Sequence, residues 1–477
     1  MLKYNLKNSN FTFGAIALLA ILSIYGWLFL QVGSNYLPVW SDEFFYYTNA
    51  NSFFQNNTLQ AALTFNGSGS RLFGADAHGF SYPLLNGGIA KIFGWHTLNF
   101  IYTNFFFVVA ALALVWFQKN ISSWQKFLIT ASVLCFPFFV LFGFTYMQES
   151  IHIFFAIACS TLIYKIYKTR QNKYYIIFVL LILVAAAFRP LWFFWLIGLI
   201  PFAKNKLQKS AFIFIFLAGV LASFAFTYFF TEAVPNYFSS IINLIQQGGF
   251  VMAFTSLVKH FVYNVYAYFF STNDTLIYLP VKYLILLPLI VFVIKAIKHK
   301  SSLYTSIALL GVINFLMLFL FYDVFKWREI RVLAPFFYFS VFYLITETGR
   351  YFKYIQVAAL AVLFILTLPL TRQWIQGRNI HLAEKVNSSK AAFDLIAEKA
   401  EDRKLIFINY TPADSSLDLI LLPVKNKTNQ PVRYIAPYYN SKKAAYNYIL
   451  NKPGTSSKDS ILVSNQYYQL QSIWPAP

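Results

Sequence analysis

The stretch WSDEFFYY, Trp40 to Tyr47, places two adjacent carboxylates, Asp42 and Glu43, a few residues beyond a long apolar run. That run, about Phe11 to Val32, is long enough to cross a bilayer, and the lysines before it place its start in the cytoplasm. The two acids are therefore expected at the outer face of the membrane. Because the chain before residue 370 is mostly apolar and carries few acids, this pair is the first candidate for chemistry.

The composition is that of a helical membrane protein. Of the 477 residues, 58% are hydrophobic and 12% are charged, whereas a soluble domain carries about 25% charged residues. Repeated apolar runs of about 20 residues predict a polytopic α-helical membrane protein with about eleven spans. The formal net charge of +21 does not indicate nucleic-acid binding, because much of the Lys and Arg lies in short loops where the positive-inside rule places it.

Alternating basic and non-basic loops give each predicted span its direction. Spans are expected at about residues 11–32, 99–117, 127–146, 151–164, 211–230, 277–297, 303–322, 332–345 and 354–370, with two more helices inside 174–203. Those two helices meet at Arg189-Pro190, because proline breaks a helix and the stretch is too long for one span. The amphipathic segment 235–274 is expected on the outer surface. Two additional spans there would leave every later loop on the same side of the membrane, so that alternative stays open.

The composition changes from Thr371 onward, where charged residues, Asn, Ser and Pro become frequent and no run is long enough to span. Helical periodicity at 391–400 and 441–450, with short buried strands at 404–409 and 460–463, predicts a small α/β domain. We therefore expect a transmembrane module at 1–370, whose external loop 33–98 carries the acidic motif, and an extracytoplasmic domain at 371–477.

Several motifs follow one another on the predicted outer side of the membrane. They are Trp40, Asp42, Glu43 and Tyr46, then Tyr82-Pro83-Leu84 and Phe93-Gly94, then Gln148-Glu149-Ser150, Arg189-Pro190, and Arg328 to Pro335. As a set they resemble the GT-C fold of glycosyltransferases that use lipid-phosphate sugars, and within it protein O-mannosyltransferases and the aminoarabinose transferase of lipid A. The resemblance covers about residues 11–370. It implies transfer of a sugar from a polyprenyl-phosphate donor to a glycan, glycolipid or protein acceptor.

Such a transfer needs a base for the acceptor and cationic groups for the departing phosphate. We expect Asp42 to be the general base, and Glu43 to orient a neighbour or help bind a metal. The plainer alternative is a solvated acidic pair in the first turn of an interfacial helix. Glu149 is expected to orient the acceptor or share a metal with the first loop, with His78 a further candidate, although a glutamate is also favoured at any helix N-terminus.

The candidates for binding the donor phosphate are basic residues on the predicted outer side, against the positive-inside bias: Arg189, Lys326, Arg328, Arg331 and Lys91. A spacing of three places Arg328 and Arg331 on one helix face. The alternatives are pairing of these arginines with nearby acids, snorkelling of Arg189 to the interface, and an ordinary interfacial role for Lys91.

No close spacing of His, Asp or Glu indicates a metal site, so a divalent metal ion is left open as a cofactor. A transporter or flippase of lipid-linked sugars is a rival interpretation, but it predicts internal repeats and charges near the membrane midplane, and neither is evident. An O-antigen ligase or polymerase would carry its chemistry in a large, late external loop. We therefore expect a multi-pass enzyme of the cytoplasmic (inner) membrane, with a cytoplasmic N-terminus.

Overall fold

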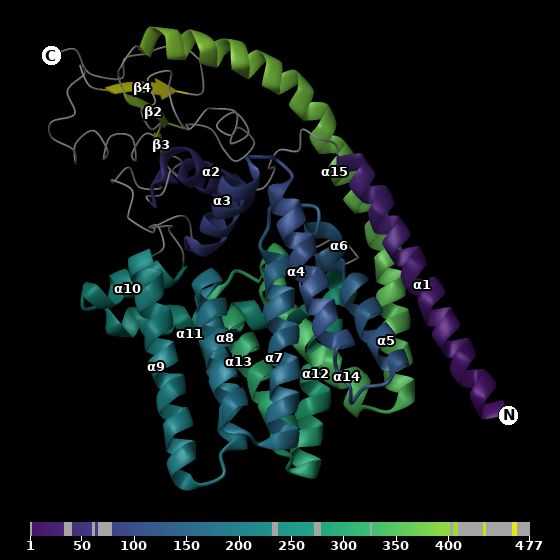
Figure 1. Ribbon diagram of the computed structural model, residues 1–477. Coiled ribbons are helices and arrows are strands. Elements are labelled where there is room, and N and C mark those ends of the chain that lie inside the picture. Colours follow the sequence, from purple (N-terminus) through teal and green to yellow (C-terminus); the bar gives the residue numbers. More distant parts are fainter. Residues whose placement is uncertain are drawn as a thin grey trace.

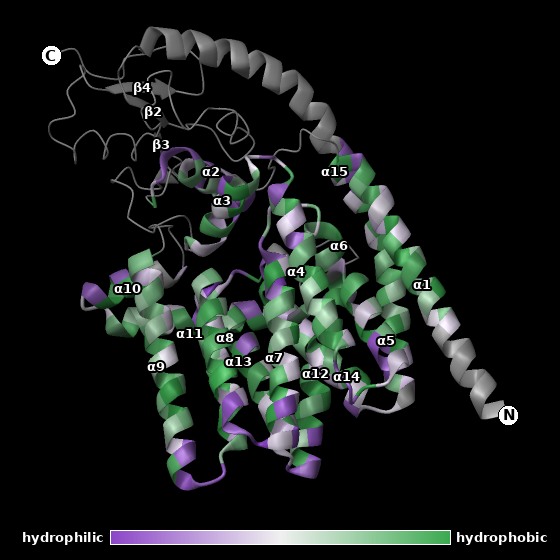
Figure 2. Ribbon diagram, viewed as in Figure 1, coloured by the Kyte–Doolittle hydropathy of each residue, from purple (hydrophilic) through white to green (hydrophobic). Residues whose placement is uncertain are grey.

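Helices make up most of the computed structural model, and they form a bundle with α2 and α3 at one end (Figure 1). The structure describes residues 2–32, 41–59, 63–64, 79–230, 237–270, 278–324, 327–400, 404–408, 433–435 and 460–464. Within these ranges, eight helices are long and apolar enough to cross a membrane. Figure 2 shows hydrophobic residues along the helices and hydrophilic residues collected at the lower helix ends. The prediction of a polytopic helical membrane protein is confirmed.

The eight candidate spans all coincide with predicted ones. They lie in α1 (Leu2–Val32), α4 (Asn99–Trp116), α7 (Glu149–Thr169), α9 (Lys206–Phe230), α12 (Tyr278–His299), α13 (Ser302–Phe321), α14 (Ala334–Glu347) and α15 (Arg350–Ala400). In the spans of α7 and α14, 83% of the most apolar window is buried, against 17% for α1 and α9. The bundle is therefore built around α7 and α14, and α1 and α9 lie at its periphery.

The other three predicted spans correspond to shorter helices. The run at 127–146 is divided into α5 (Ser123–Leu134) and α6 (Pro137–Phe142), and proline starts the second piece. The stretch 174–203 is divided at Arg189 into α8 (Asn172–Phe188) and the 3-10 helix η1 (Pro190–Phe202). The count of about eleven is thus supported for the eight long helices, and the remaining three stay predictions.

The 3-10 winding of η1 explains how a stretch too short for two ordinary spans still forms two segments. The 17 residues of α8 extend for about 26 Å at the α-helical rise of roughly 1.5 Å per residue. The 13 residues of η1 cover about the same length at the 3-10 rise of roughly 2.0 Å. Each segment therefore approaches the hydrocarbon thickness of about 30 Å, and Arg189 lies at the turn between them.

Helices α10 (Tyr237–Gln246) and α11 (Phe250–Phe270) follow α9 and lie across it rather than along it (Figure 1). Neither is among the candidate spans found in the described residues. One side of α11 is buried and contacts α13, and large apolar side chains of the same helix are exposed. These features agree with the prediction that this segment lies on the surface of the membrane region.

The predicted external loop contains α2 (Ser41–Asn56) and α3 (Ser81–Phe93), which pack against each other. Gly87 allows this close approach, because a Cβ atom there would lie 2.7 Å from the backbone oxygen of Ala50. The first residues of α2, which include the acidic pair, point toward the helix bundle. We call this end of the molecule the α2 end of the bundle.

Four short strands form a parallel sheet with the order β1-β3-β2-β4: β1 (Leu63–Thr64), β2 (Lys404–Ile408), β3 (Arg433–Ile435) and β4 (Ser460–Ser464). Strands β2 and β4 confirm the strands predicted at 404–409 and 460–463. The predicted helix at 391–400 forms the last part of α15, which runs without a break from Arg350 to Ala400. The helix expected at 441–450 lies outside the described residues. The division into domains at 370 and 371 stays a prediction.

Candidate active site

The two acids of the opening stretch occupy the first turn of α2, and their side chains have different partners. Glu43 is fully buried, and its Oε1 accepts a hydrogen bond of 2.8 Å from the backbone N–H of Tyr146. Asp42 keeps 22% of its side chain exposed and faces Arg331. Neighbouring positions on a helix point in directions about 100° apart, which explains why the two carboxylates separate.

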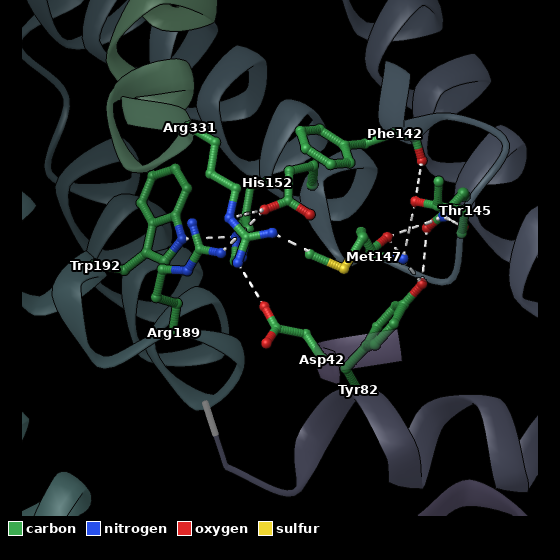
Figure 3. Close-up of polar contacts among 11 residues, drawn as sticks. Asp42, Tyr82, Phe142, Thr145, Met147, His152, Arg189, Trp192 and Arg331 are labelled. Carbon is green, nitrogen blue, oxygen red and sulfur yellow. Dashed lines mark hydrogen bonds and ion pairs between the residues drawn. The ribbon is translucent and has the colours of Figure 1, made fainter. Parts of the chain in front are cut away.

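The segment 143–148, between α6 and α7, is buried but is not part of a long helix, so its backbone groups need partners from elsewhere. Asn104 donates through Nδ2 to the carbonyl oxygens of Thr145 (2.8 Å) and Met147 (3.0 Å). The hydroxyl of Tyr82 donates to Asn104 Oδ1 at 2.9 Å and lies 3.3 Å from the Met147 carbonyl (Figure 3). Burial raises the pKa of Tyr82 well above its ordinary value, so the phenol remains protonated and can donate.

Glu43 also holds the segment 143–148 in place, because its carboxylate accepts a hydrogen bond from the backbone N–H of Tyr146 in the middle of that segment. The segment leads directly into Glu149, the first residue of α7. Tyr82, Asn104 and Glu43 thus fix the position from which Glu149 enters the bundle. The contact that Glu43 makes here is with a backbone amide, and its predicted role of orienting a neighbour or helping to bind a metal stays a prediction.

Four charged residues meet at the α2 end of the bundle, and we call them the carboxylate–arginine cluster: Asp42, Glu149, Arg189 and Arg331. Arg331 Nη2 lies 2.5 Å from Asp42 Oδ2, and Arg331 Nε lies 3.5 Å from Glu149 Oε1. Arg189 Nη2 lies 3.3 Å from the same Glu149 oxygen. Figure 3 shows the two guanidinium groups side by side with Asp42 below Arg331. Glu149 therefore bridges two arginines, and the formal charges of the cluster cancel.

The members of this cluster come from four separate parts of the chain. Asp42 lies on α2, Glu149 at the start of α7, Arg189 between α8 and η1, and Arg331 in the 3-10 helix η2 (Trp327–Leu333). Each of these residues lies in the first or last turn of a helix or between two helices. Their side chains therefore meet at the same end of the bundle. Arg189, Glu149 and Arg331 are buried.

Several polar atoms of the cluster have no hydrogen-bond partner among the described residues, although they are buried. They are Arg189 Nε and Nη1 and Glu149 Oε2; both polar atoms of the neighbouring Gln148 amide are in the same situation. A buried donor without an acceptor costs about 1–3 kcal/mol, and more when the group is charged. The free N–H groups of Arg189 are therefore the donors in the cluster that an anionic ligand would satisfy.

The pair His152 and Trp192 lies next to the cluster, and the sequence analysis missed it. Trp192 Nε1 donates to His152 Nδ1 at 3.0 Å (Figure 3). An indole nitrogen only donates, so His152 Nδ1 carries no proton and the imidazole is neutral in this arrangement. His152 follows Glu149 by three positions on α7, which puts both on one helix face. That spacing inside an apolar run was the signal available in the sequence.

The predicted site residues divide into three groups. Asp42, Glu149, Arg189 and Arg331 are brought together in the cluster. Lys91 lies apart from it: its Nζ is 2.5 Å from Asn57 Oδ1 and 3.9 Å from the centre of the Phe53 ring, beyond the far end of α2. That end is about 21 Å from Asp42 by the α-helical rise of roughly 1.5 Å per residue.

The remaining candidates fall outside the part of the chain that can be described. Lys326 and His78 lie outside the described residues, and so does the side chain of Arg328. Their predicted roles stay predictions.

Metal binding was left open by the sequence. In the described ranges, no group of three or more His, Cys, Asp or Glu side chains is arranged to hold a metal ion. Asp42 and Glu149 both face guanidinium groups, and a neutral cluster offers a dication no net attraction. As arranged, these residues do not fit a bound divalent metal, and no step below is routed through one.

No protein-family model matches the chain, and no curated protein matches it in sequence. The fold is similar to that of the oligosaccharyltransferase AglB of Archaeoglobus fulgidus. With the zinc and sulfate complex the TM-score is 0.52 at 9% identity, over 93% of this chain and 67% of that one. With the complex of an inhibitory peptide and a dolichol-phosphate it is 0.51 at 10% identity, over 94% and 69%.

A third structure of the same enzyme, tethered to an acceptor peptide, gives 0.50 at 10% identity, over 89% of this chain and 64% of that one. The chain therefore spans about two thirds of the length of the protein it resembles. AglB is a membrane glycosyltransferase of the GT-C fold. At this level of identity the likeness concerns the fold alone: this chain is a membrane protein with a fold like that of a GT-C oligosaccharyltransferase.

Proposed function

We propose that this chain is an integral membrane glycosyltransferase that moves a sugar from a polyprenyl-phosphate donor to an acceptor at the outer face of the cytoplasmic membrane. The observation that carries the proposal is the carboxylate–arginine cluster, because it combines a partly exposed carboxylate with two buried arginines. A fold like that of an enzyme solved with a dolichol-phosphate supports the same class of donor.

The departing phosphate needs cationic donors, and the cluster contains two. Two guanidinium nitrogens of Arg189, Nε and Nη1, have no protein acceptor in the described residues, so it is the first candidate to bind phosphate oxygens. Arg331 is already bonded to Asp42 and Glu149. Glu149 keeps both guanidinium groups in place through one oxygen atom, which makes it a positioning residue for the phosphate site.

Asp42 is the proposed base, and its ion pair with Arg331 describes the protein without ligand. A donor phosphate that binds Arg331 would compete with Asp42 for the guanidinium group and release the carboxylate. Asp42 would then accept the proton of the acceptor hydroxyl or amine, while the acceptor atom bonds to the anomeric carbon. The bond from that carbon to the phosphate oxygen breaks, and its electron pair stays on the phosphate, where the arginines stabilise the charge.

The finer resemblance to protein O-mannosyltransferases and to the aminoarabinose transferase of lipid A concerns the acceptor, which we propose to be a glycan, a glycolipid or a protein. The proposal also includes the orientation predicted from loop charges, with the N-terminus in the cytoplasm and the region 371–477 as an extracytoplasmic domain. In that orientation the α2 end of the bundle faces outward.

The test compares Asp42→Asn with the wild-type chain in membranes of a host that lacks it. Polyprenyl-phosphate mannose and polyprenyl-phosphate glucose, each labelled in the sugar, are supplied, and the label that leaves the lipid fraction is measured. Loss of transfer in Asp42→Asn is expected. Glu347→Gln, at the end of α14 farther from η2, is the matched acid-to-amide control. Unchanged transfer in Asp42→Asn at equal protein levels would show that Asp42 is not the base.

A second readout separates binding from chemistry. The purified variants are titrated with polyprenyl phosphate in nanodiscs, and Asp42→Asn is expected to bind it at least as well as the wild type, because Arg331 is then released from an ionised partner. A wild-type chain that neither binds polyprenyl phosphate nor releases label from either donor would overturn the proposed function.

A further inference from the structure

Asn264, on the buried side of α11, uses its whole side-chain amide to hold another part of the chain. Its Nδ2 donates to the backbone carbonyls of Phe319 (2.9 Å) and Tyr322 (2.7 Å). Its Oδ1 accepts from the backbone N–H of Val324 at 3.1 Å. The side chain is fully buried, and all three partners lie at or just beyond the end of α13.

The end of α13 needs such partners. The last carbonyl groups of an α-helix have no N–H donor within the helix and need donors from elsewhere. The chain leaves the helix at Tyr322, whose backbone is extended (φ −116°, ψ 156°), so a following helical turn supplies no N–H groups. Asn264 supplies donors from a different helix and acts as a cap for α13. His260, one turn earlier on α11, adds a contact of 3.2 Å from Nε2 to the Tyr322 carbonyl.

The position at which α13 ends bears on where Arg331 lies, because η2 follows that end closely in the chain and contacts α13. After Val324 the chain enters η2, and Arg331 of that helix is 2.5 Å from Asp42. One additional turn of α13 would move the exit of the chain by about 5.4 Å along the helix axis. Hydrogen-bond distances vary by only about 0.5 Å, so a shift of that size passed on to Arg331 would break its contacts with Asp42 and Glu149.

We propose that Asn264 is a positioning residue for the transfer reaction: by capping α13 at Tyr322 it holds Arg331 within reach of Asp42 and Glu149. This inference rests on the proposed function, since it names a residue that acts on the phosphate-binding arginine without touching the ligand. The chemistry is specific to an amide. Asn264→Asp keeps the size but has no N–H to donate to two carbonyls, and Asn264→Leu keeps the volume without any hydrogen bond.

The first test needs no ligand. Hydrogen exchange of the purified chain is followed by mass spectrometry in peptides that contain Val324, whose amide is bonded to Asn264 Oδ1. In Asn264→Leu we expect exchange there to be about tenfold faster, which is the change expected from losing one hydrogen bond of ordinary net strength. Asn314→Leu is the matched control, because Asn314 lies on α13 itself and, among the described residues, its side chain bonds to the Leu310 carbonyl of its own helix. Unchanged exchange at Val324 in Asn264→Leu would overturn the inference.

The second test asks whether Asn264 acts through Arg331. Binding of polyprenyl phosphate in nanodiscs is measured for Asn264→Leu, Arg331→Ala and the double variant. We expect about tenfold weaker binding in Arg331→Ala, since a charge-assisted contact is lost, and weaker binding in Asn264→Leu. The double variant is expected to bind no more weakly than Arg331→Ala alone, because two residues that act through one contact are not additive.

The outcomes of the two tests separate this inference from the proposed function. Additive losses in the double variant would show that Asn264 only stabilises the fold, and equal binding in Asn264→Leu and the wild type would show that it does not position Arg331. Either result would overturn the inference while leaving the proposed function in place. Absence of polyprenyl phosphate binding in the wild type would overturn the proposed function, and the exchange at Val324 would still decide whether the cap exists.

Discussion

Replacing Glu149 with glutamine removes the one negative charge that lies between the two arginines. Its Oε1 is 3.3 Å from Arg189 Nη2 and 3.5 Å from Arg331 Nε, and all three side chains are largely buried. The amide oxygen of Gln would still accept a hydrogen bond, so Glu149→Gln changes the charge and keeps nearly the same shape. Arg331 would keep its ion pair with Asp42, and Arg189 would have no carboxylate within 4.0 Å among the described residues.

The expected cost is that of leaving a buried charge without its counter-charge. Removing one member of a buried ion pair lowers the free energy of unfolding by about 3–5 kcal/mol. Most of this loss falls on Arg189, because Arg331 has a second partner. Changing Arg189 to methionine in the same chain removes the uncompensated charge, so the double variant is expected to regain about 2 kcal/mol relative to Glu149→Gln.

The measurement is the free energy of unfolding in mixed detergent micelles, titrated with SDS and followed by tryptophan fluorescence. Glu347→Gln is the control, since it is the same substitution at the last residue of α14, away from the cluster, and it is expected to change the free energy of unfolding by less than about 1 kcal/mol. The reasoning is refuted if Glu149→Gln loses less than about 1 kcal/mol, or if Arg189→Met adds a further loss in the double variant.

Substitutions at three other positions test the support of the site. Glu43→Leu is expected to lower the free energy of unfolding by about 1–3 kcal/mol, since the Tyr146 N–H loses its acceptor, whereas Glu43→Gln should cost less than about 1 kcal/mol; SDS titration distinguishes the two. Tyr82→Phe is expected to lower the free energy of unfolding by about 1 kcal/mol in the same titration, because the hydrogen bond to Asn104 is lost. The helix content measured by circular dichroism should not change. Gly87→Ala is expected to cost about 1–3 kcal/mol, because its Cβ would lie 2.7 Å from a backbone oxygen of α2; a stability equal to the wild type would show that α2 and α3 can separate freely.

The sequence predicted the helices well because hydropathy depends only on composition along the chain. Eight long apolar runs became helices at the predicted positions, and the charges of the loops placed Asp42, Glu149, Arg189 and Arg331 on one side. The side of the membrane on which a residue lies does not determine the direction of its side chain. Asp42 and Arg331 are 289 positions apart, and their contact depends on the rotation of α2 and on the point at which α13 ends.

The role of Glu43 and the presence of His152 could not be derived from the sequence for a related reason. The partner of Glu43 is a backbone amide 103 positions away, and a backbone amide has no residue type to recognise. His152 lies inside an apolar run, where a neutral histidine bonded to Trp192 is compatible with a membrane helix. The 3-10 winding of η1 could not be predicted from the sequence either, because the sequence of η1 is as apolar as that of an α-helical span.

In the proposed site, the balance of charge within the cluster explains how two buried arginines can be accommodated in the bundle and still bind a phosphate. Two carboxylates offset two arginines, so the buried charges are paired and the cluster carries no net charge that would draw water or a metal ion into the bundle. The pairing is incomplete, because two nitrogens of Arg189, Nε and Nη1, have no acceptor in the described residues. A phosphate that binds there supplies those acceptors and, through Arg331, withdraws the counter-charge from Asp42. Binding of the donor would then convert Asp42 from the partner of an arginine into a free base, so acceptor activation would follow donor binding and not precede it.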